Sequence, residues 1–277
     1  MIHITPGKSG SNSSAAGLTH QTLGAQLLGA DMAGHGALFY LSPIAANASA
    51  PARGGVPVLF PQFADAGPLR KHGFVRDVPW RLTGCRVEAG VEILCHTLEI
   101  SEQDFAAWPH SATLQLQAEL QPGRLTIRLD ILNAGKNAFA FGGGLHPYFR
   151  VQDLRQMRIS GLHGLPVQDR YQPQLRVDAA AALALDAAPF ERLYDACPDL
   201  TLWTGEKSLR LSASGFDQWM VWNPGEAGAR QLADLPDADW QRFVCIEPVR
   251  VARPVHLAPG AHFSGALTII SGPGGGA

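Results

Sequence analysis

The sequence predicts a large antiparallel β-sandwich, and three observations support that fold class. Runs that alternate apolar and polar residues, the pattern of a half-buried strand, far outnumber runs of helical periodicity. The 30 glycines and 20 prolines are scattered along the chain, as expected where many strands are joined by turns. The 277 residues are 46% hydrophobic and 17% charged, so the chain can bury a large core. All-β chains of this size often form one domain, and we expect residues 1–277 to do so.

The clearest element is a hairpin. Residues 124–132 alternate between Leu or Ile and polar side chains, so one face of this strand should be buried and the other wet. Residues 112–120 alternate in the same way. Pro122 and Gly123 lie between the two runs and are typical of a turn.

Other segments also have strand or helix character. Strands are expected at residues 91–100, 138–141, 200–204, 208–212, 218–222, 243–251 and 265–270. Residues 179–188 have helix-forming composition and are expected to form a short helix or a linker, and residues 237–242 one helical turn capped by Asp237. The glycine-rich tail 272–277 is expected to be frayed, and the sequence leaves open whether the first 20 residues are ordered.

Charge and motif content exclude several function classes. The 22 Lys and Arg and 24 Asp and Glu give a net charge of −2, so no basic excess is available for nucleic acid or an anionic membrane. No apolar run approaches the roughly 18 residues of a membrane span, and the N-terminus lacks a secretory signal. The 4 cysteines form no CxxC pair, as expected for reduced thiols in a cytoplasmic protein. The histidines show no HxH or HExxH spacing, so we expect no metal site, and without GxSxG, P-loop or GxGxxG motifs the sequence does not support serine hydrolase, NTPase or dinucleotide chemistry.

Two loops concentrate positive charge. Arg53 begins the run RGGVP, and Lys71, His72 and Arg76 lie in the run KHGFVR. Arginine offers a planar fork of donors that suits phosphate or carboxylate oxygens, and loop glycines let the backbone approach a ligand. These residues suggest an anion-binding rim, although solvated loop charges would give the same pattern.

Two further residues are candidates for proton transfer. His146 follows three glycines at the end of an apolar strand, and a free histidine titrates near neutral pH, at about 6.5. A lone histidine is more often a core residue that hydrogen-bonds to backbone. Glu247 interrupts an apolar strand, so it either faces solvent or lies in a pocket, and the adjacent Pro248 suggests an edge strand or one that opens onto a cleft. A pocketed glutamate beside a histidine would make a workable base and acid.

Three tryptophans in apolar context are expected to pack in the core: Trp80, Trp219 and Trp222.

These segments together resemble the aldose 1-epimerase (galactose mutarotase-like) superfamily, and more narrowly the hexose-6-phosphate mutarotases, also called glucose-6-phosphate 1-epimerases. The matching stretches, in the family's order, are RGGVPVLFPQF (53–63), HGFVR (72–76), WPH (108–110), LHPYF (145–149), VWNPG (221–225), CIEPVRV (245–251) and LAPGAHFSG (257–265). They cover the chain from about Gly24 to Ile270. The resemblance implies a galactose mutarotase-like supersandwich with a shallow sugar cleft.

The resemblance also implies roles for individual residues. His146 matches the family's general acid and Glu247 its general base, in a reaction that needs no cofactor or metal. The substrate-binding positions fall on Arg53, Lys71, His72, Arg76 and Glu191. This sequence departs from the family pattern at three positions, with Glu191 where Asp is usual, Lys71 where Gln is usual and Ala64 where Gly often follows the first motif. We therefore expect a monomeric, cytoplasmic isomerase that interconverts the anomers of a hexose 6-phosphate.

Three alternatives to this activity remain. A mutarotase for unphosphorylated aldoses would use the same acid and base. A catalytically silent carbohydrate-binding module would have no use for a matched proton donor and acceptor, so the presence of both His146 and Glu247 argues against it. A glycoside hydrolase or lyase would need a second catalytic carboxylate, or a basic Tyr or Lys, and the sequence identifies no convincing one.

Overall fold

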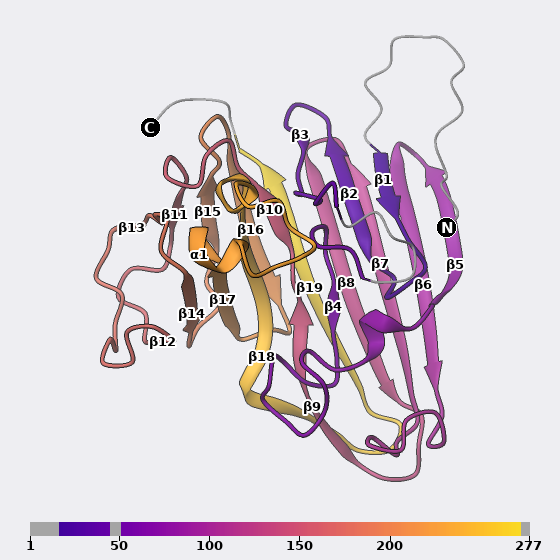
Figure 1. Ribbon diagram of the computed structural model, residues 1–277. Helices are drawn as coiled ribbons and strands as arrows, with labels where there is room; N and C mark the ends of the chain where they lie inside the picture. Colours follow the sequence, from indigo (N-terminus) through magenta and orange to yellow (C-terminus); the bar gives the residue numbers. More distant parts are fainter. Residues whose placement is uncertain (1–16, 45–50, 273–277) are drawn as a thin grey trace.

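The computed structural model describes residues 17–44 and 51–272, and most of its regular structure is β-strand, which confirms the predicted fold class (Figure 1). The described strands form sheets of three, seven and nine strands, and every pair of named strands is antiparallel. The tail that was expected to be frayed lies outside the described residues from position 273 on. Residues 1–16, whose order the sequence left open, lie outside them as well. Residues 17–20 are ordered as the first strand, β1 (Gly17–His20).

The nine-stranded sheet contains the predicted hairpin. Its strands β7 (Ala112–Gln121) and β8 (Arg124–Asn133) pair along their whole lengths, with Leu116 opposite Leu129. The apolar residues of both strands are buried except Leu132, and most of the intervening polar ones are not, as the alternation predicts. The other strands, in spatial order around this pair, are β13 (Ala182–Leu183), β11 (Arg158–Ser160), β15 (Leu200–Trp203), β16 (Ser208–Ser214) and β19 (His262–Ser271) on one side, and β6 (Val91–Ile100) and β5 (Arg81–Glu88) on the other.

The seven-stranded sheet is less regular. Its strands, in spatial order, are β12 (Val167–Asp169), β14 (Phe190–Tyr194), β17 (Gln218–Asn223), β18 (Phe243–Leu257), β9 (Phe139–Leu145) and β4 (Val58–Leu59), with β10 (Tyr148–Arg150) also paired to β18. A small sheet of β1, β2 (Leu27–Met32) and β3 (Gly36–Ala37) completes the fold, and β1 and β2 contact β6 and β7 (Figure 1). One hydrophobic core joins side chains from all three sheets.

Three sequence expectations need correction in part. Residues 179–188 form no helix but contain β13, because burying Leu183 and Leu185 on one face needs a two-residue repeat. The helical turn near residue 237 is a 3₁₀ turn, η2 (Asp239–Arg242), preceded by Ala238 and not capped by Asp237. Of the two alternatives for Pro248, the edge strand is wrong, since β18 lies between β17 and β9.

The remaining described helices are short. They are η1 (Val75–Asp77), which follows the second cationic loop, and α1 (Gly225–Ala229), which follows β17. Within residues 17–44 and 51–272, no helix has the length and apolar character needed to cross a membrane.

Candidate active site

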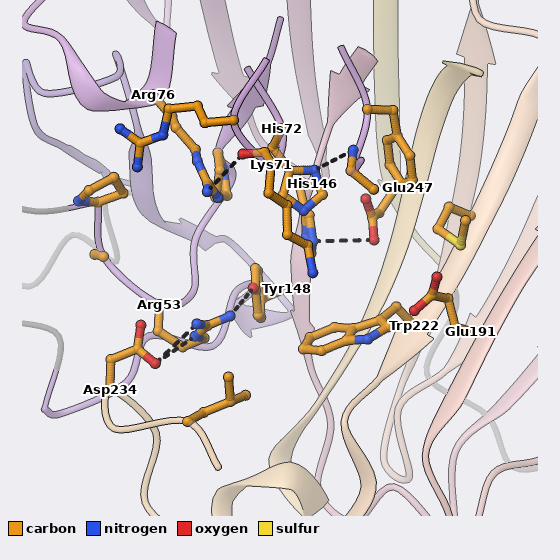
Figure 2. A pocket seen from close by; sticks show the side chains of 18 of the residues that line it. Arg53, Lys71, His72, Arg76, His146, Tyr148, Glu191, Trp222, Asp234 and Glu247 are labelled. Atoms are coloured by element: carbon orange, nitrogen blue, oxygen red, sulfur yellow. Dashed lines mark hydrogen bonds and ion pairs between the residues drawn. The ribbon is translucent and has the colours of Figure 1, made fainter. Parts of the chain in front are cut away.

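A single cavity of about 500 Å³ collects all seven residues that the sequence singles out (Figure 2). Glu247 on β18 and Glu191 on β14 come from the seven-stranded sheet, and His146 from the link between β9 and β10. The other four residues come from two loops and from η1: Arg53, Lys71, His72 and Arg76. Residues that are up to 194 positions apart, from Arg53 to Glu247, therefore share one site.

Two glycines bring the strands around His146 close together. Gly143 and Gly144 of β9 both have positive φ, at 133° and 157°. A Cβ on Gly143 would lie 2.1 Å from the carbonyl oxygen of Leu59, and one on Gly144 would lie 2.2 Å from that of Pro248. Any side chain at these positions would push β4 or β18 away. The three-glycine run thus allows β9 to deliver His146 against the strand that carries Glu247.

His146 and Glu247 face each other in the cavity. The His146 Nε2 atom lies 3.4 Å from Glu247 Oε1, and Glu247 is 1% exposed. Of the two readings of Glu247 that the sequence left open, the pocket is the correct one. The imidazole is held by aromatic rings on several sides: Tyr148 stacks on it with ring centroids 4.9 Å apart, and His72 and Trp222 meet it edge-on at 5.6 and 6.0 Å. Packing therefore fixes the orientation of the His146 ring.

Burial favours the uncharged forms of both partners. It raises the pKa of Glu247 well above its usual value, and the nearby Glu191 carboxylate raises it further. Burial also lowers the pKa of His146 well below its usual value, and His72, Arg53 and Arg76 lower it further. The Glu247 Oε2 atom is buried and accepts no hydrogen bond from the described residues, so it is free to meet a ligand.

The positive charges around the cavity are only partly compensated. Asp234 lies 3.0 Å from Arg53, Asp77 lies 3.2 Å from Arg70, and Glu191 lies 3.2 Å from Arg170. Lys71 has no ion pair within residues 17–44 and 51–272. Arg76 is 3.9 Å from the same Asp77 carboxylate that Arg70 contacts, and its buried Nε has no hydrogen-bond acceptor in the described part of the chain. Lys71 and Arg76 thus leave a surplus of positive charge on this wall.

His72 contributes no positive charge at neutral pH. Burial lowers its pKa to about 3, and the charges of Arg76, Lys71 and Arg53 act in the same direction. Its Nδ1 accepts a hydrogen bond of 3.1 Å from the backbone N–H of Ala64, as a neutral ring can. His72 therefore acts as a fixed polar ring between the cationic loop and His146.

Several cavity residues were missed from the sequence. Trp222 was expected in the core with Trp80 and Trp219; those two are fully buried, but Trp222 lines the cavity. Tyr148 begins β10 two residues after His146, and its nearness to His146 in the sequence was a usable signal. Asp234 lies between α1 and η2 in a segment without periodicity, so the sequence held no signal for its contact with Arg53.

One group of three side chains in the described residues has the spacing of a metal site. Atoms of His146, Cys245 and Glu247 all lie within 4.8 Å of one another. Zinc would bind the cysteine as a thiolate. Burial, together with Glu247, raises the pKa of the Cys245 thiol well above its usual value, which opposes that thiolate. The donor set therefore fits a metal poorly.

Comparisons with known proteins agree on one family. Residues 12–269 match the family model described as aldose 1-epimerase. A protein of Escherichia coli K12 named "Putative glucose-6-phosphate 1-epimerase" is 32% identical over 224 residues, which cover 74% of this chain and 72% of that protein. A protein of Cenchrus ciliaris with the same name is 27% identical over 235 residues, covering 80% of this chain and 70% of that one. The crystal structure of "a putative mutarotase (YeaD)" from Salmonella typhimurium superposes with a TM-score of 0.84 at 26% identity, over 93% of this chain and 88% of that one.

Proposed function

The chain belongs to the aldose 1-epimerase family, a family of isomerases, and on that premise we propose that it interconverts the α and β anomers of a hexose 6-phosphate, with glucose 6-phosphate as the expected substrate. The observation that carries the phosphosugar assignment is the cavity itself. It holds a histidine and a glutamate at contact distance beside a wall on which Lys71 and Arg76 leave positive charge uncompensated.

In the proposed reaction, one proton moves at each end of the breaking bond. Glu247, as carboxylate, takes the proton of the C1 hydroxyl, and His146, as imidazolium, gives a proton to the ring oxygen O5. The C1–O5 bond breaks and C1 becomes an aldehyde carbon. Rotation about C1–C2 then presents its other face to O5, and the two side chains reverse their roles as the ring closes. The proton count is conserved over the cycle.

Burial of the pair helps the ring to open. The closed sugar requires the charged forms of His146 and Glu247, whereas the open sugar leaves both neutral. Because burial raises the pKa of Glu247 and lowers that of His146, the protein environment favours the neutral, ring-opened side of the step. The buried Glu247 Oε2, which accepts no hydrogen bond from the described residues, is available for the C1 hydroxyl.

The other end of the cavity suits a phosphate. Arginine binds phosphate oxygens through charge-assisted hydrogen bonds, and the buried Nε of Arg76 has no acceptor among the described residues. We assign phosphate contacts to Arg76, Lys71 and Arg53, with His72 beside them. To Glu191, which lies opposite Trp222 and lines the cavity, we assign acceptance of a hydrogen bond from a sugar hydroxyl.

Exchange of anomers tests the proposal directly. NMR saturation transfer between the two anomers is measured for glucose 6-phosphate and for glucose, with the wild type, Glu247→Gln, and Glu102→Gln as a control at an exposed glutamate. We expect faster exchange of the phosphosugar, lost only in Glu247→Gln. Acceleration of glucose alone would instead indicate a mutarotase for free aldoses, and sugar binding without any acceleration would indicate a binding module.

The proposal extends to the form of the enzyme. We propose that it acts as a monomer in the cytoplasm and folds as one domain, since one hydrophobic core joins the three sheets. Size-exclusion chromatography with light scattering tests the first point, because a stable dimer would elute at twice the 29.6 kDa of the chain.

A further inference from the structure

The cationic wall and the acid/base pair are in physical contact. The Nη1 of Arg53 donates a hydrogen bond of 3.3 Å to the hydroxyl of Tyr148, whose ring stacks on His146. From the other loop, the ring of His72 meets that of His146 at 5.6 Å, and Arg76 donates to the backbone oxygen of Lys71, the neighbour of His72. Each loop thus reaches His146 through one ring (Figure 2).

This contact brings two sets of positive charge close together, one on the wall that would bind the phosphate and one on the protonated His146. Ring opening uses a protonated, positively charged His146, yet its cavity already holds the unpaired charge of Lys71 and that of Arg76, which shares the Asp77 carboxylate with Arg70. Like charges repel more strongly in a cavity shielded from water than in bulk solvent. The titratable or charged groups that face the pair from every side are Arg53, Lys71, His72 and Arg76 from the loops, Tyr148 from β10, Glu191 from β14, and Cys245 from β18.

We propose that the phosphate dianion of the substrate is an activator as well as an anchor, because it neutralises the surplus charge of Lys71 and Arg76 and so lets the His146–Glu247 pair keep the proton that ring opening requires. This inference rests on the proposed function, since it assumes that a phosphate occupies that wall. The charges match a dianion, because Lys71 has no ion pair among the described residues and Arg70 and Arg76 share the single carboxylate of Asp77.

The chemistry of the step follows from the proton balance. Without an anion, the cationic wall favours loss of the shared proton to solvent, which leaves a neutral imidazole and a glutamate carboxylate. That state still has a base for the C1 hydroxyl but no acid for O5. With the dianion bound, the imidazolium persists, its proton passes to O5, and Glu247 takes the proton of the C1 hydroxyl. The phosphate should therefore raise kcat as well as lower KM.

Splitting the substrate into two pieces tests this inference. Xylose has the ring of glucose without C6, and inorganic phosphite at about pH 8 is a dianion that can fill the vacated phosphate position. We expect phosphite to accelerate xylose mutarotation by about tenfold. At a pH above the pKa of His146, the protonated fraction of the ring rises about tenfold for each unit by which a neighbouring charge raises that pKa. Arg76→Ala should abolish the activation, and Arg210→Ala, at an exposed pair with Asp199, should not.

Two variants separate activation from simple anchoring. Removal of one cation relieves the repulsion, so Arg76→Ala and Lys71→Gln should turn over xylose faster than the wild type when no phosphite is present, although both bind glucose 6-phosphate more weakly. An anchor alone would leave xylose turnover unchanged. Lys71 is exposed, so its replacement should leave the fold intact.

A pH profile gives an independent readout. Burial lowers the pKa of His146, and the charges of Arg53 and Arg76 lower it further, so a bound dianion that offsets those charges should move the basic limb of xylose kcat/KM to higher pH. In NMR titrations of the imidazole Cε1–H, assigned with His146→Asn, phosphite should likewise raise the pKa of His146. A structural effect of phosphite, such as ordering of a loop, would raise the rate without moving either titration.

The negative outcomes are distinct. If phosphite inhibits turnover of glucose 6-phosphate competitively but leaves xylose turnover and the His146 titration unchanged, the phosphate is only an anchor and the inference is wrong. Phosphite that has no effect on either sugar overturns it as well, since the dianion then has no site of its own. If glucose 6-phosphate itself is not turned over, the proposed function has failed instead.

Discussion

The nine-stranded and seven-stranded sheets follow the same pairing rules but differ in how their strands treat polar residues. In β8 the buried and solvent-facing positions alternate along the whole strand, and its polar side chains other than Asn133 lie on the solvent-facing side. The first seven residues of β18 are all buried, and one of them is the ionisable Glu247. Burying a carboxyl costs free energy unless the group is neutral or paired. We infer that the nine-stranded sheet contributes mainly to stability, whereas the seven-stranded sheet buries the proposed acid and base at a cost in stability.

The largest effect on activity that would test this contrast is expected from the Glu247→Gln variant. The amide keeps the size of the side chain but cannot take a proton, so we expect kcat for glucose 6-phosphate to fall by about 10²–10⁴-fold. The free energy of unfolding should not fall with it. Steady-state kinetics and urea unfolding measure the two effects, and a variant that retains full activity would remove Glu247 from the base role.

The reverse behaviour is expected from Leu129→Ala in β8. Leu129 is 1% exposed in the core, so its truncation should lower the free energy of unfolding by about 2–5 kcal/mol. The KM and kcat of the remaining folded enzyme should be unchanged. Arg128→Ala, on the wet face of the same strand, is the matched control and should change stability by less than about 0.5 kcal/mol. A loss of activity at constant stability would show that the two sheets are not separable in this way.

Arg76→Ala sharpens the contrast within the cavity itself. It removes a proposed phosphate donor but neither the acid nor the base. We expect the KM for glucose 6-phosphate to rise by roughly 10–150-fold, which corresponds to the loss of about 1.5–3 kcal/mol from a charged hydrogen bond. Initial-rate kinetics over a range of substrate concentrations measure the effect. An unchanged KM would remove Arg76 from the phosphate site.

The pH dependence of stability distinguishes the buried carboxyl from any surface carboxyl. Because burial raises the pKa of Glu247 in the folded protein, its contribution to stability is complete below the unfolded pKa of about 4.5 and is lost as the pH rises through the folded value. Glu247→Gln stays neutral, so it should gain stability over the wild type with rising pH, by up to about 1.4 kcal/mol per pH unit. Urea unfolding at several pH values checks this. Glu102→Gln should show no such gain, and a difference that does not change with pH would contradict the prediction.

The smallest effect is expected from Tyr148→Phe. The ring that stacks on His146 is kept, and only the hydroxyl that accepts the Arg53 hydrogen bond is lost. The net value of such a bond is about 0.5–1.5 kcal/mol, so the KM for glucose 6-phosphate should rise roughly 2–12-fold at nearly constant kcat. A fall in kcat larger than the change in KM would mean that the hydroxyl takes part in proton transfer.

The same contrast explains how far the sequence could be interpreted. In β7 and β8 the alternation of side chains alone predicted the strands, their turn and their buried face. Each residue there faces either the core or solvent, so its polarity indicates its side of the sheet. The all-buried start of β18 has no alternation, so the environment of Glu247 could not be decided from local pattern. The resemblance to a family supplied His146 and Glu247, and the structure brought them to 3.4 Å.

Contacts between distant loops were beyond either kind of sequence reasoning. Arg53 and Asp234 are separated by 181 positions, and their ion pair depends on how the segment between α1 and η2 folds back over the cavity. Trp222 has the same apolar neighbours in sequence as a core residue, and only its place opposite Glu191 turns it toward the site. Such placements are set by tertiary packing, which the order of residues along one strand does not encode.

The two glycines of β9 also limit how this enzyme can be altered. Carbonyl oxygens of Leu59 and Pro248 occupy the space that any side chain at Gly143 or Gly144 would need. Libraries intended to change sugar preference should therefore leave both positions constant. Lys71 offers the opposite opportunity, since its side chain is exposed and has no ion pair in the described part of the chain, so the charge at the cavity mouth can be redesigned there without rebuilding the scaffold.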